Sequence, residues 1–290
     1  MTTFASDTGA AGPEKSGSSA SSPCVLVTGA GRGLGRAIAE AFHAKGYLVV
    51  ATDCDFGLLG DLEGDPGYVT ARHDVSDIDA AAEIAALIRE RCGRLDVIVN
   101  NAGVNSFYPV CESPPQRTID GFMINTFGAL VVSQACLDLL IESHGRIINI
   151  ASESSPFRAP FQIYQSTKMA LECLSDVMRR ELQLFGVHVA IIRPGAIRTE
   201  LIEGARNVEV KAAGSRFEPY FPRLREMVAK GMPKKVSEPE EVAEVVYRAA
   251  TDPKRKVMYR INNDLKQRLA LLVPKRLMDK LIMRMLGGAR

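Results

Sequence analysis

The sequence contains no tryptophan, no cysteine pair in a C-x-x-C arrangement and no apolar run of the length, about 18 residues, that a transmembrane helix requires. The six cysteines and four histidines are dispersed, so we expect reduced structural thiols and no metal site. A net charge of +2 over 290 residues gives no reason to expect a nucleic-acid partner. These absences favour a cytoplasmic globular protein without zinc.

Residues 1–23 are rich in Ser, Gly, Ala and Thr, and they lack the basic start and apolar stretch of a signal peptide. We expect a disordered N-terminal tail that ends at Pro23. Over the whole chain 46% of the residues are hydrophobic and 24% are charged, which is ordinary for a globular protein with a sizeable core.

A glycine-rich stretch follows the tail. The apolar residues from Val25 to Val27 lead into Thr28 and then into glycines at positions 29, 31, 33 and 35, after which residues 37–42 have helical spacing. This order predicts a strand, a tight turn and a helix whose first N–H groups can bind a pyrophosphate. The spacing of Gly29, Gly33 and Gly35 differs from the G-x-G-x-x-G fingerprint, and such turns also occur where a strand and a helix simply pack closely.

A second predicted strand, residues 47–52, ends at Asp53, which lies 24 residues beyond Gly29. An acidic residue at about this separation binds the adenosine ribose hydroxyls and repels a 2′-phosphate, so Asp53 favours NAD over NADP. Arg32 argues the other way, because a guanidinium beside the turn can pair with that phosphate. Asp55 is an alternative ribose ligand.

Strand and helix patterns alternate along the rest of the chain. We expect strands at 67–71, 95–99, 145–151 and 187–192, and helices at 78–91, 117–143 and 162–185. Such alternation predicts an α/β fold with a Rossmann-type, doubly wound parallel sheet in three α/β/α layers, as one domain over residues 24–262. Ligands of such sheets bind beyond the carboxyl ends of the strands. That edge would gather residues 29–35, 53, 74, 100–103, 152 and 194–199.

Tyr164 and Lys168 are four residues apart on a predicted helix, hence on one face. An ammonium group near a phenol stabilises the phenolate, so the pair makes Tyr164 a candidate proton carrier. Ser152 lies at the end of a predicted strand, 12 residues before Tyr164, and could bind the same substrate oxygen. Ser154 and Ser155 are alternatives for that role.

Taken together, these motifs resemble the short-chain dehydrogenase/reductase family, in its common single-domain branch. The resemblance covers about residues 24 to 262 and is carried by Thr28 with the three glycines, Asp74, the run from Asn100 to Gly103, Asn125, Ser152, Tyr164 with Lys168, and Pro194-Gly195 with Thr199.

The resemblance implies a catalytic set of Asn125, Ser152, Tyr164 and Lys168. Tyr164 would exchange the proton with the substrate oxygen, Ser152 would orient that oxygen, and Asn125 would support a water that leads protons to solvent. Lys168 would lower the pKa of Tyr164 and hold the nicotinamide ribose. The cofactor would also contact Gly29, Arg32, Gly33, Leu34, Gly35, Asp53, Asp74, Val75, Asn101, Ala102, Gly103, Pro194, Gly195, Ile197 and Thr199, with Asp74 at the adenine amino group.

Two later segments bear on the substrate and on partners. Residues 200–232 mix arginines with aromatic residues and would form a substrate lid, suited to an apolar or amphipathic alcohol or to a hydroxy acid, unless the charges are only solvated surface. Residues 263–290 alternate leucines with lysines and arginines, and Pro274 would divide them into two helices. This basic amphipathic extension could pack on a subunit or the core, or contact a membrane surface.

The sequence therefore predicts an NAD-dependent oxidoreductase that interconverts a secondary alcohol and a ketone, and the resemblance suggests a homodimer or homotetramer. One alternative is an NADPH-dependent 3-oxoacyl thioester reductase, which Arg32 would favour. The other is a regulatory protein that binds the nucleotide without turnover, although such a protein has no need of a proton carrier.

Overall fold

The computed structural model describes residues 22–105, 107–198, 214–231, 236–262 and 272–287. Its strands are β1 (Cys24–Thr28), β2 (Leu48–Asp53), β3 (Tyr68–Arg72), β4 (Val97–Asn100), β5 (Arg146–Ile150), β6 (His188–Pro194) and β7 (Met258–Ile261). Its α-helices are α1 (Gly33–His43), α2 (Ala80–Arg91), α3 (Pro115–Phe122), α4 (Gly128–Ala135), α5 (Leu137–Ser143), α6 (Tyr164–Leu182), α8 (Phe221–Gly231), α9 (Pro239–Thr251) and α11 (Lys275–Leu286).

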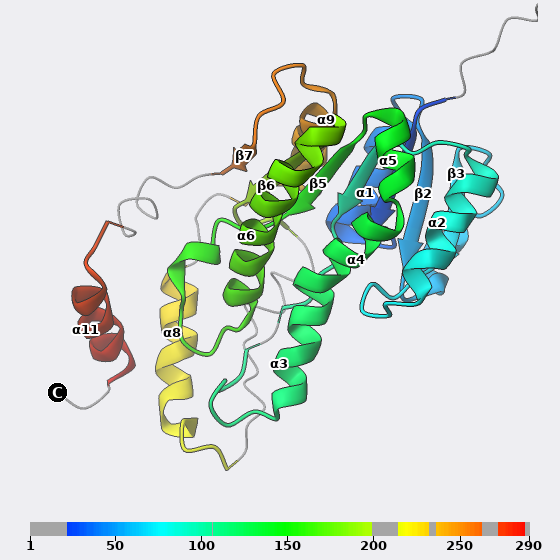
Figure 1. Cartoon of the computed structure of the whole chain (residues 1–290). Helices are drawn as coiled ribbons and strands as arrows, with labels where there is room; N and C mark the ends of the chain where they lie inside the picture. The colour runs from blue at the N-terminus through cyan, green and yellow to red at the C-terminus, as the bar shows by residue number, and fades with distance from the viewer. Residues whose placement is uncertain (1–21, 106, 199–213, 232–235, 263–271, 288–290) are drawn as a thin grey trace, which may run out of the picture.

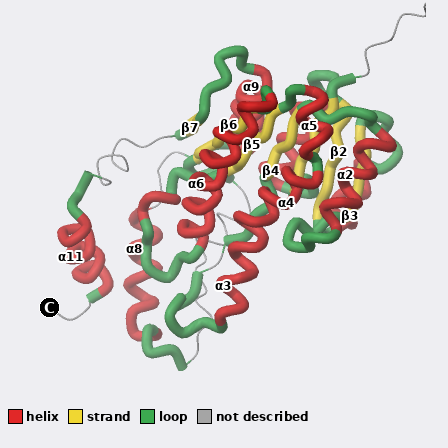
Figure 2. The backbone as a smooth tube through the Cα atoms, in the orientation of Figure 1, coloured by secondary structure: helices red, strands yellow, loops and turns green. Residues whose placement is uncertain are grey.

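The seven strands form one sheet in the order β3-β2-β1-β4-β5-β6-β7, and every neighbouring pair is parallel. The order runs outward from β1 in two directions, which places a switch point between β1 and β4. Helices cover both faces of the sheet (Figures 1 and 2). The predicted doubly wound parallel sheet is confirmed, with β7 added beyond the strands that the sequence indicated.

Successive strand residues point to opposite faces, and both faces are buried. Val25 and Val27 of β1 pack in one core with α1 and α9, whereas Leu26 packs in a second core with α2, α4, α5 and α6. All three side chains are fully buried. A strand that is covered on both sides needs apolar residues at every position, which explains the continuous rather than alternating apolar runs.

The predicted continuous helix over residues 117–143 is wrong. The chain forms α3, then a π-helical turn at Met123–Phe127, then α4 and α5. The axis bends by 62° between Pro115–Ala135 and Leu137–Ser143. Cys136, at the bend, leaves the helical conformation with ψ 11° while its side chain is buried in the second core, so packing outweighs helical continuity.

Among the described residues, no single helix is both long enough and apolar enough to cross a bilayer. Only the bent pair from Pro115 to Ser143 passes that test by length and composition, when its two segments are taken together. Val132, Leu139 and Leu140 of this pair lie buried in the second core, against the sheet.

Candidate active site

The turn between β1 and α1 requires glycine for two reasons. Gly29 and Gly33 have φ values of 65° and 56°, in the left-handed region that favours glycine. A Cβ on Gly35 would lie 1.9 Å from the carbonyl oxygen of Gly29, so the start of α1 lies directly on the turn. Arg32, the N-cap residue, makes no side-chain cap bond to the helix, and the first turn of α1 has no acidic residue. The first N–H groups of α1 are thus arranged to bind an anion at the positive end of the helix dipole.

The residues after β4 hold this turn in place. The Asn101 amide Nδ2 donates to the carbonyl oxygens of Thr28 and Gly29, at 3.0 and 3.2 Å. The Thr28 hydroxyl oxygen accepts from the backbone N–H groups of Asn101 and Ala102, both at 3.1 Å. The glycine turn and the Asn101–Gly103 segment therefore form one rigid unit at the carboxyl ends of β1 and β4.

Two carboxylates lie at the carboxyl ends of β2 and β3. The Oδ2 atom of Asp53 accepts from the Gly31 N–H at 3.0 Å, which places this carboxylate beside the glycine turn. The exposed Asp74 accepts from the backbone N–H and the hydroxyl of Ser76, at 2.9 and 2.6 Å, and these bonds lower its pKa. Next to Asp74, Val75 is buried against α4, where it contacts Gly128.

Tyr164, at the start of α6, is partly buried and lies close to the Ser152 side chain. Burial raises the pKa of Tyr164 to about 12, and the Ser152 side chain opposes this rise. Ser152 also shares a hydrogen bond of 2.9 Å with the Ser154 hydroxyl. The sequence led us to expect that Lys168 lowers the pKa of Tyr164, but the pKa is raised. Burial disfavours the phenolate, and the Lys168 ammonium group is hydrogen-bonded to a backbone carbonyl oxygen instead of the tyrosine.

Lys168 is only 3% exposed, and its Nζ donates to the carbonyl oxygen of Ile150 at 2.8 Å, at the end of β5. Its Nζ lies 5.9 Å from the centre of the Tyr164 ring. Burial lowers the pKa of Lys168 to about 8. A Cβ on Gly103 would lie 3.4 Å from Nζ and 3.1 Å from Oδ1 of Asn125, so the Asn101–Gly103 segment passes over both side chains.

Asn125 lies in the π-helical turn and is 3% exposed. Its Oδ1 accepts from the Val104 N–H at 2.8 Å, and its Nδ2 donates to the Val104 carbonyl at 2.9 Å and to the Thr167 hydroxyl at 3.0 Å. Asn125 thus connects the loop after β4 to Thr167 of α6, the residue that precedes Lys168. Single π-helical turns are frequent at functional sites.

The residues after β6 are placed in part. The Pro194 carbonyl accepts from the Glu153 N–H at 2.9 Å, and the Gly195 N–H donates to Ile261 at 2.9 Å. Ile197 pairs with Ser237 in an isolated bridge, and its side chain is buried in the first core, so only its backbone can face a ligand. Thr199 and part of the predicted lid, residues 200–213 and 232, lie outside the described residues.

Sequence reasoning missed a buried polar network beneath the site. Asn100 and Asn149 are paired in register on β4 and β5, and Nδ2 of Asn100 donates to Oδ1 of Asn149 at 2.8 Å. Nδ2 of Asn149 in turn donates to the Ser175 hydroxyl of α6 at 2.8 Å. The sequence could have indicated this network, because it places one asparagine in each of two apolar strands and a buried amide needs a hydrogen-bond partner.

Arg193 and Glu172, which the sequence analysis also left out, form a buried ion pair that fixes the end of β6 to α6. The guanidinium Nε of Arg193 donates to Oε1 of Glu172 at 2.8 Å. Breaking such a pair would leave an uncompensated buried charge.

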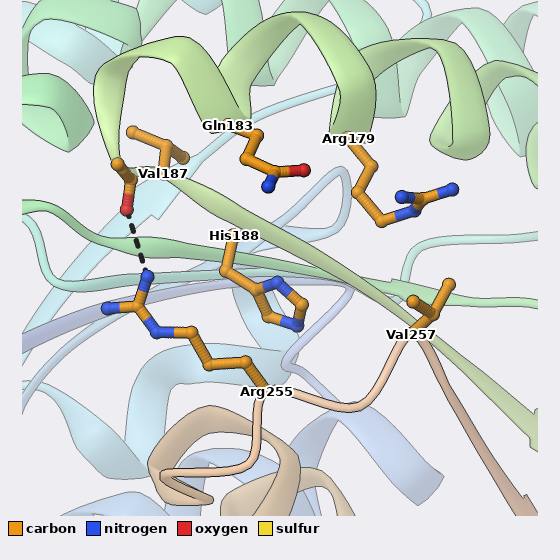
Figure 3. A pocket seen from close by; sticks show the side chains of 7 residues that line it. Arg179, Gln183, Val187, His188, Arg255 and Val257 are labelled. Carbon is orange, nitrogen blue, oxygen red and sulfur yellow. Dashed lines mark hydrogen bonds between the residues drawn. The ribbon is translucent and has the colours of Figure 1, made fainter.

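A hollow of about 250 Å³ lies at the opposite end of β6, where the strand begins at His188. Figure 3 shows the side chains that line it. The Arg255 guanidinium donates to the Gly186 carbonyl at 3.2 Å across this hollow, and Arg179 pairs with Asp176 at 3.2 Å. None of the predicted site residues lines it. The hollow is lined by Arg179, Gln183, Gly186, Val187, His188, Arg255 and Val257.

Comparisons with known proteins identify the family of this chain. The family model for short chain dehydrogenases matches residues 23–209. The chain belongs to the short-chain dehydrogenase/reductase family. An NADPH-dependent 3-dehydrocapnine reductase of Ornithobacterium rhinotracheale is 30% identical over 279 residues, which cover 88% of this chain and 94% of that protein.

Solved structures of the family have the same fold. A short-chain dehydrogenase from Streptomyces avermitilis superposes with a TM-score of 0.72 at 28% identity, covering 93% of this chain and 96% of that one. An alcohol dehydrogenase from the archaeon Thermococcus sibiricus, complexed with 5-hydroxy-NADP, superposes with a TM-score of 0.66 at 25% identity, covering 82% and 94%. This chain is therefore an NAD(P)-dependent oxidoreductase that acts on CH–OH or carbonyl groups.

The residues of this chain fit a dinucleotide. The start of α1 offers backbone donors without a competing side-chain cap, Asp53 lies beside the turn, and the buried Lys168 lies under the Asn101–Gly103 segment. A cationic group, carboxylate acceptors and open N–H groups are the chemistry that a pyrophosphate and two riboses require. The individual site residues remain predictions that variants can test.

Proposed function

We propose that this enzyme interconverts an apolar secondary alcohol and its ketone, with Tyr164 as the acid and base. The observation that carries the proposal is the placement of Tyr164 close to Ser152 and one helical turn from the buried Lys168. Two hydroxyl groups that lie close together can both reach a single substrate oxygen. The bound nicotinamide would supply or accept the hydride, so the protein contributes geometry and proton transfer.

Each residue has a distinct part in this mechanism. Ser152 donates to the substrate oxygen and fixes its position, and Tyr164 gives its proton to that oxygen in reduction or takes it in oxidation. The raised pKa keeps Tyr164 protonated near pH 7, which is the form that reduction requires. Lys168 holds the ribose hydroxyls, and Asn125 fixes the loop after β4 against α6.

An aromatic cluster supports an apolar substrate. Phe161, three residues before Tyr164, packs edge-to-face on Phe217 and Phe221, with ring centroids 5.4 and 6.0 Å apart. Phe107, after β4, belongs to the same cluster, and Tyr108 N–H donates to the Phe161 carbonyl at 3.0 Å. Aromatic side chains of this kind bind apolar groups, so the substrate class follows from what lies next to the proton carrier.

For the cofactor, we propose NAD. The carboxylate of Asp53, at the end of β2 and 3.0 Å from the Gly31 N–H, would repel a 2′-phosphate. Titration with NADH and NADPH, followed by nicotinamide fluorescence, tests this preference. We expect tighter binding of NADH, and Asp53→Asn should reduce the difference. Tighter NADPH binding by the unchanged protein would contradict the assignment.

A second candidate is an NADPH-dependent reductase of 3-oxoacyl thioesters. The name of the Ornithobacterium relative, the NADP analogue in the Thermococcus structure and the exposed Arg32 beside the turn favour NADPH. The two candidates separate in one substrate screen. Oxidation of apolar secondary alcohols with NAD⁺ supports the first, and reduction of 3-oxoacyl thioesters with NADPH alone supports the second.

For the assembly, we propose a homodimer or homotetramer formed through α4 and α6, which lie in the two segments predicted as long helices. Phe127, just before α4, is 46% exposed, and Val177 of α6 is 42% exposed. Burying these side chains against a second copy would be favourable by about 25 cal/mol per Å² of apolar area. Sedimentation velocity should show a dimer or tetramer, and Val177→Glu should shift it to monomer. A wild-type monomer at micromolar concentration would contradict the proposal.

A further inference from the structure

The carboxyl-terminal helix α11 is docked on α8 by one of its faces. Leu286 is only 4% exposed and packs in a cluster with Phe221 and Leu224 of α8, and Ile282 joins that cluster. The Arg223 guanidinium of α8 donates to the Leu286 carbonyl at 3.3 Å, at the end of α11. Figure 1 shows α11 beside α8, on the side of α8 that faces away from the sheet. The docked face therefore has its partner within the chain.

A second apolar row remains uncovered. Leu277, Leu281 and Met285 follow one another at intervals of four residues, so they lie in one row along α11. Their exposed fractions are 49%, 41% and 49%. Each step of four residues turns about 40° around the helix, and this row covers the sector next to that of Ile282 and Leu286. Packing on α8 thus accounts for only part of the apolar surface.

A basic row borders the exposed apolar row on its other side. Arg276, Lys280 and Arg284 also follow at intervals of four residues, and all three are exposed. The helix carries one further basic residue, Lys275, and a single acidic residue, Asp279. The whole chain has a net charge of only +2, so positive charge is concentrated on this helix.

The charge pattern distinguishes the possible occupants of this face. A symmetric contact with a second copy would bring two basic rows together, because the same patch is used by both subunits. Like charges at such a contact repel. A surface of anionic phospholipid headgroups attracts Lys and Arg by about 1 kcal/mol each and accepts an apolar row at the boundary of its acyl chains.

We infer that the outer face of α11, formed by Leu277, Leu281 and Met285 with Arg276, Lys280 and Arg284, docks the enzyme on an anionic phospholipid surface. The helix lies in the interface and does not cross the bilayer, since it has 12 residues. The inference stands beside the proposed reaction and does not depend on it.

The test is co-sedimentation of the full-length protein with vesicles of phosphatidylcholine alone or mixed with phosphatidylglycerol. We expect binding to the mixed vesicles only, weakened by high salt because exposed charges are screened. The triple variant Arg276→Gln/Lys280→Gln/Arg284→Gln should bind about 100-fold more weakly, from about 1 kcal/mol per charge. Leu277→Ser/Leu281→Ser/Met285→Ser should lose at least about tenfold in affinity.

Two control variants carry changes of the same kind elsewhere. Arg91→Gln/Arg180→Gln/Lys254→Gln removes three exposed charges, and Ile78→Ser/Leu184→Ser removes two apolar side chains that are 59% and 83% exposed. Both should bind vesicles as the unchanged protein does. Thermal melting and NADH affinity in vesicle-free buffer should be unchanged in all four variants, because Ile282 and Leu286 keep α11 on α8.

Three results would overturn the inference. The first is equal binding to both kinds of vesicle, and the second is equal loss of binding in the control variants. The third is no vesicle binding together with self-association that the serine variant abolishes, which would assign the face to a second copy. If the unchanged protein does not bind NADH or shows no turnover, that result counts against the proposed function. It does not affect the conclusion from the vesicle experiment.

Discussion

Lys168 lies at the carboxyl edge of the sheet and Arg255 near the amino edge, and each donates a hydrogen bond to a backbone carbonyl oxygen. Lys168 bonds to Ile150 at 2.8 Å and is almost fully buried, so its pKa falls to about 8. Arg255 bonds to Gly186 at 3.2 Å but is exposed. The hydrogen bonds are alike and the surroundings differ.

The two edges therefore differ in burial more than in residue type. At the carboxyl edge Tyr164 and Lys168 both have shifted pKa values, because burial disfavours the charged form of each group. At the amino edge the hollow in Figure 3 is lined by basic groups and by His188, whose pKa is lowered by burial, and none of its lining residues is a tyrosine, a serine or a lysine. The comparison singles out the carboxyl edge as the place where a tyrosine and a serine lie near a buried lysine.

The largest expected effect is on turnover. Tyr164→Phe removes the hydroxyl that carries the proton and should lower kcat by about 10²- to 10⁴-fold. Steady-state kinetics with the best substrate of the screen measures the loss, and NADH fluorescence should show nearly unchanged cofactor affinity. Arg179→Gln, at the amino edge, is the control. Equal rates for Tyr164→Phe and the unchanged enzyme would remove Tyr164 from its role.

The next effect is on stability as a function of pH. The pKa of Lys168 is about 8 in the folded protein and 10.5 in its ordinary environment, so between these values the unfolded chain binds more protons. Stability should therefore rise from pH 8 to pH 10, by up to about 3 kcal/mol at about 1.4 kcal/mol per unit. Urea unfolding of the wild type and of Lys168→Met measures it. The variant should lack the rise, and identical pH profiles would contradict the shift.

A smaller effect is expected from the glycine turn. Gly35→Ala would place a methyl carbon 1.9 Å from the carbonyl oxygen of Gly29, so the turn would have to shift to make room. We expect a loss of about 1–3 kcal/mol in the free energy of unfolding, together with weaker cofactor binding. Gly60→Ala is the matched control, because nothing lies within 4 Å of its added Cβ. Similar losses in both variants would show that crowding at Gly35 is not the cause.

The smallest effect is expected at the amino edge. Arg255→Gln removes one exposed hydrogen bond to Gly186, so the free energy of unfolding should change by less than about 1 kcal/mol and kcat should stay the same. Thermal melting and steady-state kinetics check both quantities. A kcat reduced by tenfold or more would show that the two edges are coupled.

The sequence predicted those parts of the fold that depend on local pattern. Val25 to Val27, the glycines and the apolar run before Asn100 identify buried strands, and strand ends in a parallel sheet meet at one edge. The break at Cys136 was not predictable, because it results from packing against residues distant in the chain. The same holds for the pairing of Asn100 with Asn149, which requires the register of β4 and β5.

Charge states at the site depended on tertiary structure as well. The spacing of Tyr164 and Lys168 placed them on one face, but it suggested a direct electrostatic effect between them. In the folded chain the ammonium group is satisfied by Ile150, and burial dominates both pKa values. The burial of these side chains depends on the loops that follow β4 and β5. Helical periodicity in the sequence gives no information about those loops.

The hydrogen bonds of Asn125 also determine what deamidation of this residue would do to the site. Deamidation converts an asparagine to an aspartate and so replaces Nδ2, a donor, by an oxygen. In this site that oxygen would face the Val104 carbonyl and the Thr167 hydroxyl, whose own proton is donated to the Tyr164 carbonyl at 2.7 Å. Neither group could donate a hydrogen bond to the new oxygen. A deamidated molecule would therefore lose the connection between the loop after β4 and α6, although its gene is unchanged.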